Sequence, residues 1–310
     1  MSDRLLKRLA AALVIVVVAW GVLALVRRPP SDRLGSLSLA KVDTAAVDSM
    51  TVATARDTMI VARARGARGK WLASGFAADS TAVQSVLKAL ADTSNITELV
   101  AESRTSHERL GVAADSATHV VVFGKGGARV FDLMTGHRTG DYSGIDVRRP
   151  SDAAVYALKG LLVDALARAP SDWRDKRILA VLPESVSTIQ VEHGGRGYEV
   201  KRSGTAWTLG SGKRADSAAV ADFLGNFRDL RASGFATRAE ADSLDFKKPT
   251  ATIRLLGKSG SAVADVTVDS AASGEWARTS AGLSVYKLDS FVWSRLAPAE
   301  STLVPKPKKT

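Results

Sequence analysis

The residues that could carry out chemistry in this chain occur in short motifs, and each motif lacks the partners that its chemistry needs. Ser85-Val86-Leu87-Lys88 fits the S-x-x-K pattern of serine acyltransferases. Such a serine must stand at a helix start, beside its lysine base. Ser85 instead falls in the middle of a predicted helix, on the face opposite its apolar side chains. We therefore expect Ser85 and Lys88 to lie on an exposed helix face and predict no enzymatic activity.

Metal and phosphate sites are not indicated either. The four histidines are His107, His119, His137 and His193. None of them occurs at a spacing that is typical of metal ligands. The absence of cysteine excludes thiolate zinc sites, iron–sulfur clusters and a cysteine nucleophile. The glycine-rich segments 124–127 and 210–213 lack the G-x-x-x-x-G-K-[ST] pattern of phosphate loops and are expected to be hairpin turns. We predict no catalytic residues, no metal and no cofactor.

One polar and aromatic run stands out as a candidate contact site. It consists of Asp172, Trp173, Arg174, Asp175 and Lys176. Tryptophan and arginine are favoured anchors of protein interfaces, so the run could bind a partner. It also lies between the two halves of the body, where Trp173 could pack between modules while the charges pair locally. We name these five residues as a candidate interface or inter-module contact.

The elements around these residues repeat along the chain. Segments 47–52 and 186–191 open two copies with the alternating apolar residues of a half-buried strand. A tryptophan follows in each copy, Trp71 and Trp207. Further along, Arg148, Val155 and Tyr156 match Arg278, Val285 and Tyr286 at one constant offset. The paired tryptophans and tyrosines are expected to be core or sheet residues.

A helix gives the strongest match between the copies. Asp79 and Asp216 each precede a serine and a helical pattern, and aspartate caps the free N–H groups of a first helical turn. The apolar stripes are Val83, Val86, Leu87 and Leu90 in the first copy, and Val220, Phe223, Leu224 and Phe227 in the second. Each stripe has the spacing of one buried helix face.

These patterns predict an α+β fold with two tandem similar modules. Each copy is expected to run strand–strand–helix–strand–strand–strand, with a closing helix. Short glycine-containing turns indicate antiparallel hairpins, and a long crossover of the parallel kind is expected only at the central helix.

An uninterrupted apolar run, Leu9–Val26, predicts one N-terminal transmembrane helix with basic residues at both ends. Bulky Val26 and charged Arg27 stand where a signal peptide would need small residues, so we expect an uncleaved anchor. The expected topology is single-pass in the cytoplasmic (inner) membrane, with an extracytoplasmic C-terminal body. The net charge of +11 comes in large part from the helix flanks and the C-terminal lysines, so nucleic-acid binding is not predicted.

The order of these features resembles a bacterial family known as domain of unknown function 4340. The resemblance is carried by the anchor, Lys70-Trp71, the two Ala-Asp-Ser helix starts, Val155-Tyr156 and the run from Asp172 to Leu179. Members typically accompany ABC transporters of the gliding-motility type. The resemblance therefore implies a permease, an ATPase and another extracytoplasmic subunit as partners, and it supplies no catalytic residues.

We expect a non-catalytic, membrane-anchored accessory or scaffold subunit of an ABC-type transporter complex. An envelope module that binds polysaccharide or peptide is the alternative, and a hydrolase is a weaker one because no acid/base constellation is visible. The expected parts are a tail (1–8), the transmembrane helix (9–26), a linker (27–45), the first module (46–176), the second module (177–297) and a basic Pro/Lys tail (298–310).

Overall fold

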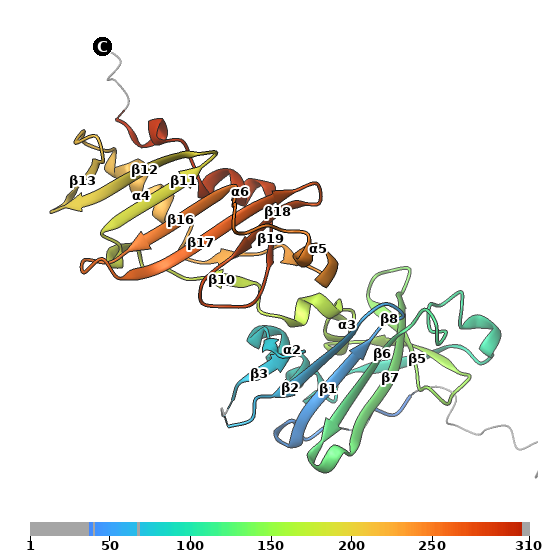
Figure 1. Cartoon of the computed structure of the whole chain (residues 1–310). Coiled ribbons are helices and arrows are strands. Elements are labelled where there is room, and N and C mark those ends of the chain that lie inside the picture. Colours follow the sequence, from blue (N-terminus) through green and yellow to red (C-terminus); the bar gives the residue numbers. More distant parts are fainter. Residues whose placement is uncertain (1–36, 40, 67–68, 306–310) are drawn as a thin grey trace, which may run out of the picture. The chain divides into compact units, whose positions relative to one another are not determined.

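The computed structural model describes residues 37–39, 41–66 and 69–305 (Figure 1). The chain divides into two compact units, Met1–Trp173 and Arg174–Thr310, whose described residues we call module 1 and module 2. This division falls three residues before the boundary expected from the sequence. The expected transmembrane helix, Leu9–Val26, lies outside the described residues. Among the residues that are described, no helix is long and apolar enough to cross a membrane.

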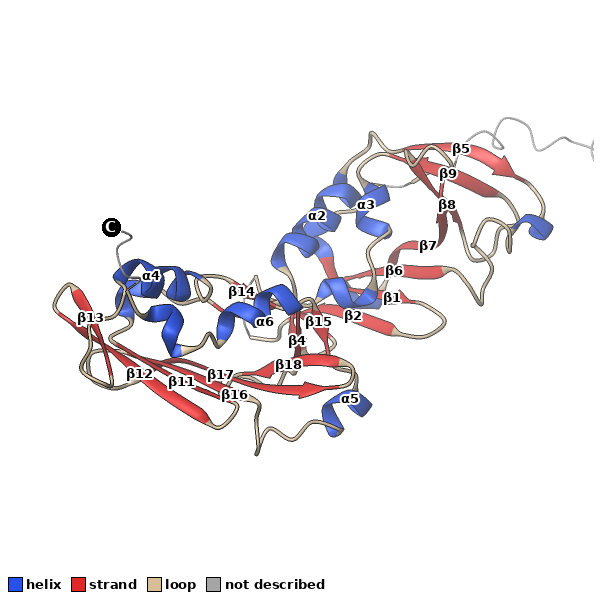
Figure 2. Cartoon of the chain, turned by 90° about the horizontal axis from the view of Figure 1, so that it is seen from above, coloured by secondary structure: helices blue, strands red, loops and turns tan. Residues whose placement is uncertain are grey.

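Module 1 is a nine-stranded sheet with the order β4-β3-β2-β1-β6-β7-β8-β9-β5. Its strands are β1 (Val47–Ala53), β2 (Thr58–Arg63), β3 (Trp71–Ala73), β4 (Phe76–Ala77), β5 (Ile96–Ala101), β6 (Thr118–Gly124), β7 (Arg129–Arg138), β8 (Gly144–Arg148) and β9 (Val155–Lys159). The helices α2 (Ser80–Ala91) and α3 (Leu162–Leu166) cover one face of this sheet, and the core lies between them and the sheet (Figure 2). The short turns are η1 (Thr44–Ala46), η2 (Arg104–Ser106), η3 (Lys125–Gly127) and η4 (Pro170–Trp173).

Module 2 has an eight-stranded sheet with the order β13-β12-β11-β16-β17-β18-β19-β15, and β10 pairs separately with β14. Its strands are β10 (Arg177–Leu179), β11 (Thr188–His193), β12 (Arg196–Ser203), β13 (Ala206–Leu209), β14 (Leu230–Arg231), β15 (Gly234–Phe235), β16 (Ala251–Leu256), β17 (Ala262–Ala271), β18 (Gly274–Arg278) and β19 (Tyr286–Leu288). Its helices are α4 (Ser217–Gly225), α5 (Arg238–Asp242) and α6 (Ser290–Leu296), with the turns η5 (Pro183–Ser185) and η6 (Glu300–Leu303).

The predicted α+β class and the repeated sheet modules are confirmed. From β3 to β5 the strand order of module 1 matches, strand by strand, the order from β13 to β15 in module 2. The expected parallel crossover is wrong, because every strand pair in the described residues is antiparallel. Helix α2 leads instead from β3 and β4 at one edge of the sheet to β5 at the opposite edge.

The helix caps show how the two copies use equivalent residues. The Asp79 carboxylate accepts the N–H groups of Thr81 and Ala82 at 2.8 and 3.0 Å. The Asp216 carboxylate does the same for the second and third residues after it, at 2.9 and 3.2 Å. These bonds satisfy N–H groups that the first turn of a helix leaves free. The predicted capping residues therefore start α2 and α4.

An arginine–tryptophan pair also recurs at the same place in both sheets. Arg63 lies over the Trp71 ring, and Arg202 lies over the Trp207 ring, each at 4.7 Å from the ring centroid. In both modules the two residues are cross-strand partners. The tryptophans are thus sheet residues that pack on the cores, as the repeat predicted.

Each module closes with a turn that returns to the start of its central helix. The Trp173 carbonyl accepts the Asp79 N–H at 2.9 Å, and the Leu303 carbonyl accepts the Asp216 N–H at 2.8 Å. Both side chains are buried, at 1% and 2% exposure. Trp173 therefore holds in module 1 the position that Leu303 holds in module 2. The packed part of module 2 extends to Leu303, within the segment that we expected to be a tail.

Candidate functional site

The first half of strand β7 has an unpaired edge. Strand β7 pairs with β6 from Arg129 to Thr135, whereas its ladder with β8 starts only at Met134. In the described part of the chain, the segment from Arg129 to Leu133 therefore has a strand on one side only. Free N–H and C=O groups at such an edge can pair with another chain.

A groove of about 530 Å³ lies along this edge, and we call it the β7 groove. It is lined by Ser38, Leu39, Arg129, Val130, Phe131, Asp132, Leu133, Arg149, Pro150 and Ser151. Ser38 and Leu39 come from the segment that precedes β1, and residues 149–151 come from the chain that leaves β8. The groove is therefore built where the ladder between β7 and β8 stops.

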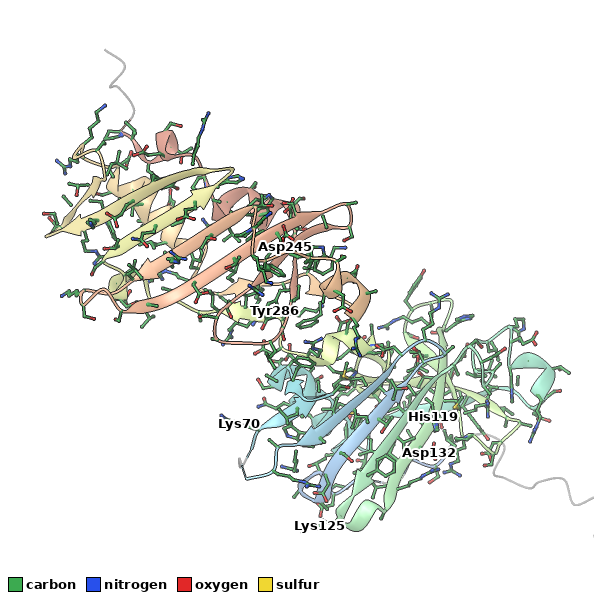
Figure 3. The ribbon with its side chains drawn as sticks, in the orientation of Figure 1. Lys70, His119, Lys125, Asp132, Asp245 and Tyr286 are labelled. Atoms are coloured by element: carbon green, nitrogen blue, oxygen red, sulfur yellow. The ribbon has the colours of Figure 1, made fainter. Side chains whose placement is uncertain are left out.

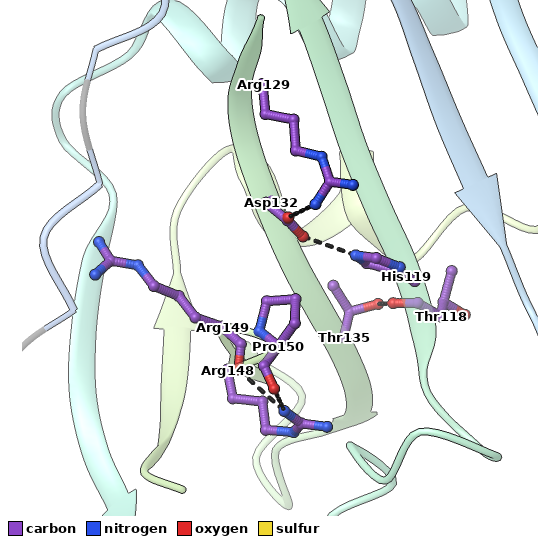
Figure 4. Close-up of polar contacts among 8 residues, drawn as sticks. All are labelled: Thr118, His119, Arg129, Asp132, Thr135, Arg148, Arg149 and Pro150. Carbon is purple, nitrogen blue, oxygen red and sulfur yellow. Dashed lines mark hydrogen bonds and ion pairs between the residues drawn. The ribbon is translucent and has the colours of Figure 1, made fainter. Parts of the chain in front are cut away.

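A charged cluster stands at the groove (Figures 3 and 4). The Asp132 carboxylate is 2.7 Å from the His119 Nε2 atom and 3.1 Å from the Arg129 Nη1 atom. Across the groove, the Arg149 guanidinium donates a hydrogen bond to the Ser38 carbonyl at 2.9 Å. Asp132, the one carboxylate in the groove lining, already has two basic partners. A ligand in the groove would therefore contact mainly the N–H donors of the Arg129 and Arg149 guanidinium groups. Guanidinium groups in this setting favour acidic or carbonyl-rich ligands.

Module 2 treats the equivalent position differently. Asp265 matches Asp132, and its carboxylate accepts hydrogen bonds from the Ser280 N–H at 3.0 Å and from the Ser280 hydroxyl. Pro150 occupies the matching position in module 1, and proline has no N–H to donate. The chain after β8 therefore makes no such bond to Asp132, which instead binds His119 and Arg129. Module 2 has a hollow of similar volume near Asp265, lined by β16, β17 and the segment from Phe246 to Pro249.

An arginine at the end of β8 holds the loop between β5 and β6 against the sheet. Buried Arg148 donates from Nε to the Val112 carbonyl at 2.7 Å and from Nη1 to the Arg149 and Pro150 carbonyls (Figure 4). Burial lowers the pKa of Arg148, the nearby Arg104 lowers it further, and Asp152 opposes this shift. In module 2, Arg278 makes the matching contact with Phe246. Arg148 is therefore a structural residue that holds the chain beside the β7 groove.

The five residues predicted as a contact site are divided between the two modules. Trp173 lies in the core of module 1, with the Arg168 guanidinium over its ring at 5.6 Å. Arg174 belongs to module 2, where its guanidinium lies 3.6 Å from the Phe235 ring centroid and bonds the Ser284 hydroxyl at 3.1 Å.

The other three residues each make a hydrogen bond that involves the backbone. The Asp172 N–H donates to the Ala169 carbonyl, the Asp175 carboxylate accepts the Arg177 N–H, and the Lys176 carbonyl accepts the Ala232 N–H. A role of the whole run in an interface stays a prediction.

The remaining motifs lie where the sequence placed them. Ser85 and Lys88 are exposed on α2. Gly126 and Gly127 adopt positive φ angles in the β6–β7 turn, which is the conformation that glycine tolerates best. Within residues 37–39, 41–66 and 69–305, no group of three metal-ligating side chains comes together. The sequence reasoning missed the β7 groove, although the mismatch between Pro150 and Ser280 was visible in the repeat.

Comparison with known proteins assigns the chain to a family. The model of the domain of unknown function DUF4340 matches residues 71–249, more than half of the chain. The chain belongs to this family. The DUF4340 match starts at β3 of module 1 and ends just before β16 of module 2, so it takes in parts of both copies. No curated protein and no solved structure matches this DUF4340 chain.

Proposed function

We propose that this DUF4340 protein is a non-catalytic, membrane-anchored accessory subunit of an ABC-type transporter complex. The apolar run Leu9–Val26 supports the anchor, and the resemblance of the sequence supports the transporter partners. In this proposal the two modules lie outside the cytoplasmic membrane and dock a permease or another extracytoplasmic subunit. The ATPase belongs to the same complex and acts from a separate polypeptide.

The observation that carries the docking role is the unpaired edge of β7 beside Arg129 and Arg149. An extended segment of a partner can add to such an edge as a strand, so that main-chain hydrogen bonds hold it and side-chain pockets select it. The two guanidinium groups favour a segment that carries acidic residues. We therefore propose an extended, acidic segment of the extracytoplasmic partner as the occupant of the β7 groove.

Affinity purification of the full-length protein in mild detergent tests this function. A permease and an ATPase should co-purify, and Arg149→Glu should reduce their recovery because it reverses a charge at the groove. Lys125→Glu makes the same charge change at the exposed β6–β7 turn, outside the groove lining, and should leave recovery unchanged. Absence of both transporter components from the wild-type sample would refute the proposal. Equal recovery with Arg149→Glu would refute docking at the groove.

The anchor has a separate test. A variant that lacks residues 1–28 should move from the membrane fraction to the soluble fraction after cell lysis. If that variant sediments with the membranes after a high-salt wash, the single-anchor part of the proposal is wrong. The salt wash removes proteins that are held only by surface charge.

A further inference from the structure

A second hollow in module 1, of about 330 Å³, contains a buried carboxyl group with no partner. It is lined by Val100, Arg109, Leu110, His137, Arg138, Thr139, Gly140 and Asp146. Asp146 lies on β8 and is 5% exposed. No residue in the described part of the chain makes a hydrogen bond or an ion pair with its carboxyl group. Buried carboxyl groups are normally paired, so an unpaired one beside a hollow points to a ligand.

The loop over this hollow is held in place by close backbone contact. A Cβ atom on Gly136 would lie 2.1 Å from the Leu110 carbonyl, and one on Gly111 would lie 2.7 Å from the His137 ring. The Leu110 carbonyl also accepts the His137 N–H at 3.0 Å. The loop therefore rests directly on β7, which fixes the His137 ring and positions Arg109 at the hollow.

The charges around Asp146 favour an anion. Burial raises the pKa of the Asp146 carboxyl, and the nearby His137 and Arg109 oppose this rise. Arg109 makes no hydrogen bond or ion pair with any residue that the structure describes. Arg138, which also lines the hollow, is 2.7 Å from Asp164. Basic donors therefore outnumber the one carboxyl group in the hollow.

The other charged groups near Asp146 are already paired. On β9, which pairs with β8, Lys159 forms an ion pair at 3.0 Å with Glu98 of β5. Two residues along β8, Arg148 donates to backbone carbonyls. Arg109, His137 and Asp146 thus remain as the groups that can meet a ligand.

Module 2 shows what this position looks like when it is filled. Trp276 matches Asp146, and Lys287 matches Ala157, the cross-strand neighbour of Asp146. Trp276 is 1% exposed, its Nε1 donates to the Ser273 hydroxyl at 3.1 Å, and the Lys287 ammonium lies 5.5 Å from its ring centroid. Trp276 and Lys287 thus fill in module 2 the region that Asp146 and Ala157 leave open in module 1.

We propose that this hollow binds a small organic or inorganic anion through carboxylate or phosphoryl oxygens, with Arg109 and His137 as donors. The Asp146 carboxyl, in its neutral form, donates a further hydrogen bond to the anion. A volume of about 330 Å³ lies at the lower end of the range for small-molecule sites, which fits one such group on a small molecule. The site stands independently of the proposed docking at the β7 groove.

Calorimetric titration of the full-length protein in detergent with three probes tests the site. D-glucuronate presents a carboxylate, inorganic phosphate presents phosphoryl oxygens, and D-glucose is the neutral control. We expect glucuronate or phosphate to bind, and which of them binds tells whether a carboxylate or a phosphoryl group is recognised. Arg109→Ala should weaken that binding about tenfold, the loss of one charge-assisted contact. Lys125→Ala should not change it.

The role of Asp146 gives a pH signature. Binding should tighten as the pH falls from 7.5 to 5.5, because a larger fraction of the Asp146 carboxyl is then neutral. Asp146→Asn keeps a neutral donor, so it should bind at least as tightly at pH 7.5 and lose this part of the pH dependence. Asp146→Trp places the module 2 residue in the hollow and should abolish binding.

Several results would overturn the proposal. These results are binding of glucose alone, no binding of either anion at about 20 mM, and wild-type affinity in Arg109→Ala.

 Any of these outcomes would show that the hollow is not an anion site. Arg109→Ala should also leave the recovery of transporter components unchanged, so failure of this site and failure of the docking proposal are distinguishable.

Discussion

The sequence context of Trp173 allows two roles, as a core residue or as an anchor for a partner. Replacing Trp173 by alanine distinguishes them. The side chain is 1% exposed and belongs to the core of module 1, and its carbonyl accepts the Asp79 N–H at the start of α2. If the indole is mainly a core residue, Trp173→Ala should destabilise module 1 and leave module 2 unchanged. If it is mainly a partner anchor, the same variant should fold normally and lose a partner.

The expected loss can be estimated from the contacts of the indole. A buried tryptophan removes about 150–250 Å² from water, which at about 25 cal/mol per Å² is worth about 4–6 kcal/mol. The Arg168 guanidinium over the ring adds about 0.5–1 kcal/mol. The buried Nε1 has no hydrogen-bond partner among the described residues, so its removal offsets about 1–2 kcal/mol of the lost free energy of unfolding. The net loss should therefore be about 3–5 kcal/mol, in the usual range for removal of a buried aromatic side chain.

Hydrogen–deuterium exchange read by mass spectrometry measures this loss for each module separately. Trp173→Ala should speed exchange in the peptides of α2, β1 and β6, while peptides of α4 and β16 keep their wild-type protection. Leu303→Ala is the matched control, and it should produce the reverse pattern with a loss of about 2–4 kcal/mol. Trp173→Leu keeps an apolar side chain and should cost less than the alanine variant. Unchanged protection of module 1 in Trp173→Ala would refute the core role.

Two further predictions concern single carboxyl groups. Asp79→Ala and Asp216→Ala should each lower the unfolding free energy of their own module by about 1 kcal/mol, as measured by denaturant titration. The asparagine variants should lose little. A loss in the other module would contradict the equivalence of the two caps. Asp146→Asn should raise stability near neutral pH, because burial raises the pKa of Asp146 in the folded state and ionisation therefore costs stability as the pH rises above the usual value of 3.8. Thermal unfolding at neutral and at strongly acidic pH checks this, since the gain should vanish where the carboxyl is protonated in both states.

The sequence predicted the parts of the fold that depend on local pattern. The caps Asp79 and Asp216 and the buried helix stripes were readable because a helix repeats its contacts every three or four residues. Strand β5 was missed because its pattern is inverted: Ile96 and Val100 are exposed, whereas Thr97 is buried and bonds the Leu37 backbone. Its pairing with β9 depends on a contact between distant segments, which no local pattern encodes.

The candidate sites were missed for a related reason. Both lie where module 1 departs from module 2, with Pro150 in place of Ser280 and Asp146 in place of Trp276. Agreement between the two copies is what defines the repeat, so positions at which the copies differ give no signal of their own. The β7 groove also depends on where the ladder between β7 and β8 ends, and this is set by β6, β7 and β8 together.

The placement of β5 has a consequence for how the protein folds. Helix α2 carries the chain to the far edge of the sheet, where Leu99 pairs with Tyr156, a residue that comes much later in the chain. Module 2 repeats this arrangement with Phe235 and Tyr286. Such distant pairings make folding slow and leave an early strand open to wrong partners until its own partner arrives. Each module should therefore complete its sheet only after its last strand has emerged, so a chain that is cut before β9 or β19 will lack a closed module.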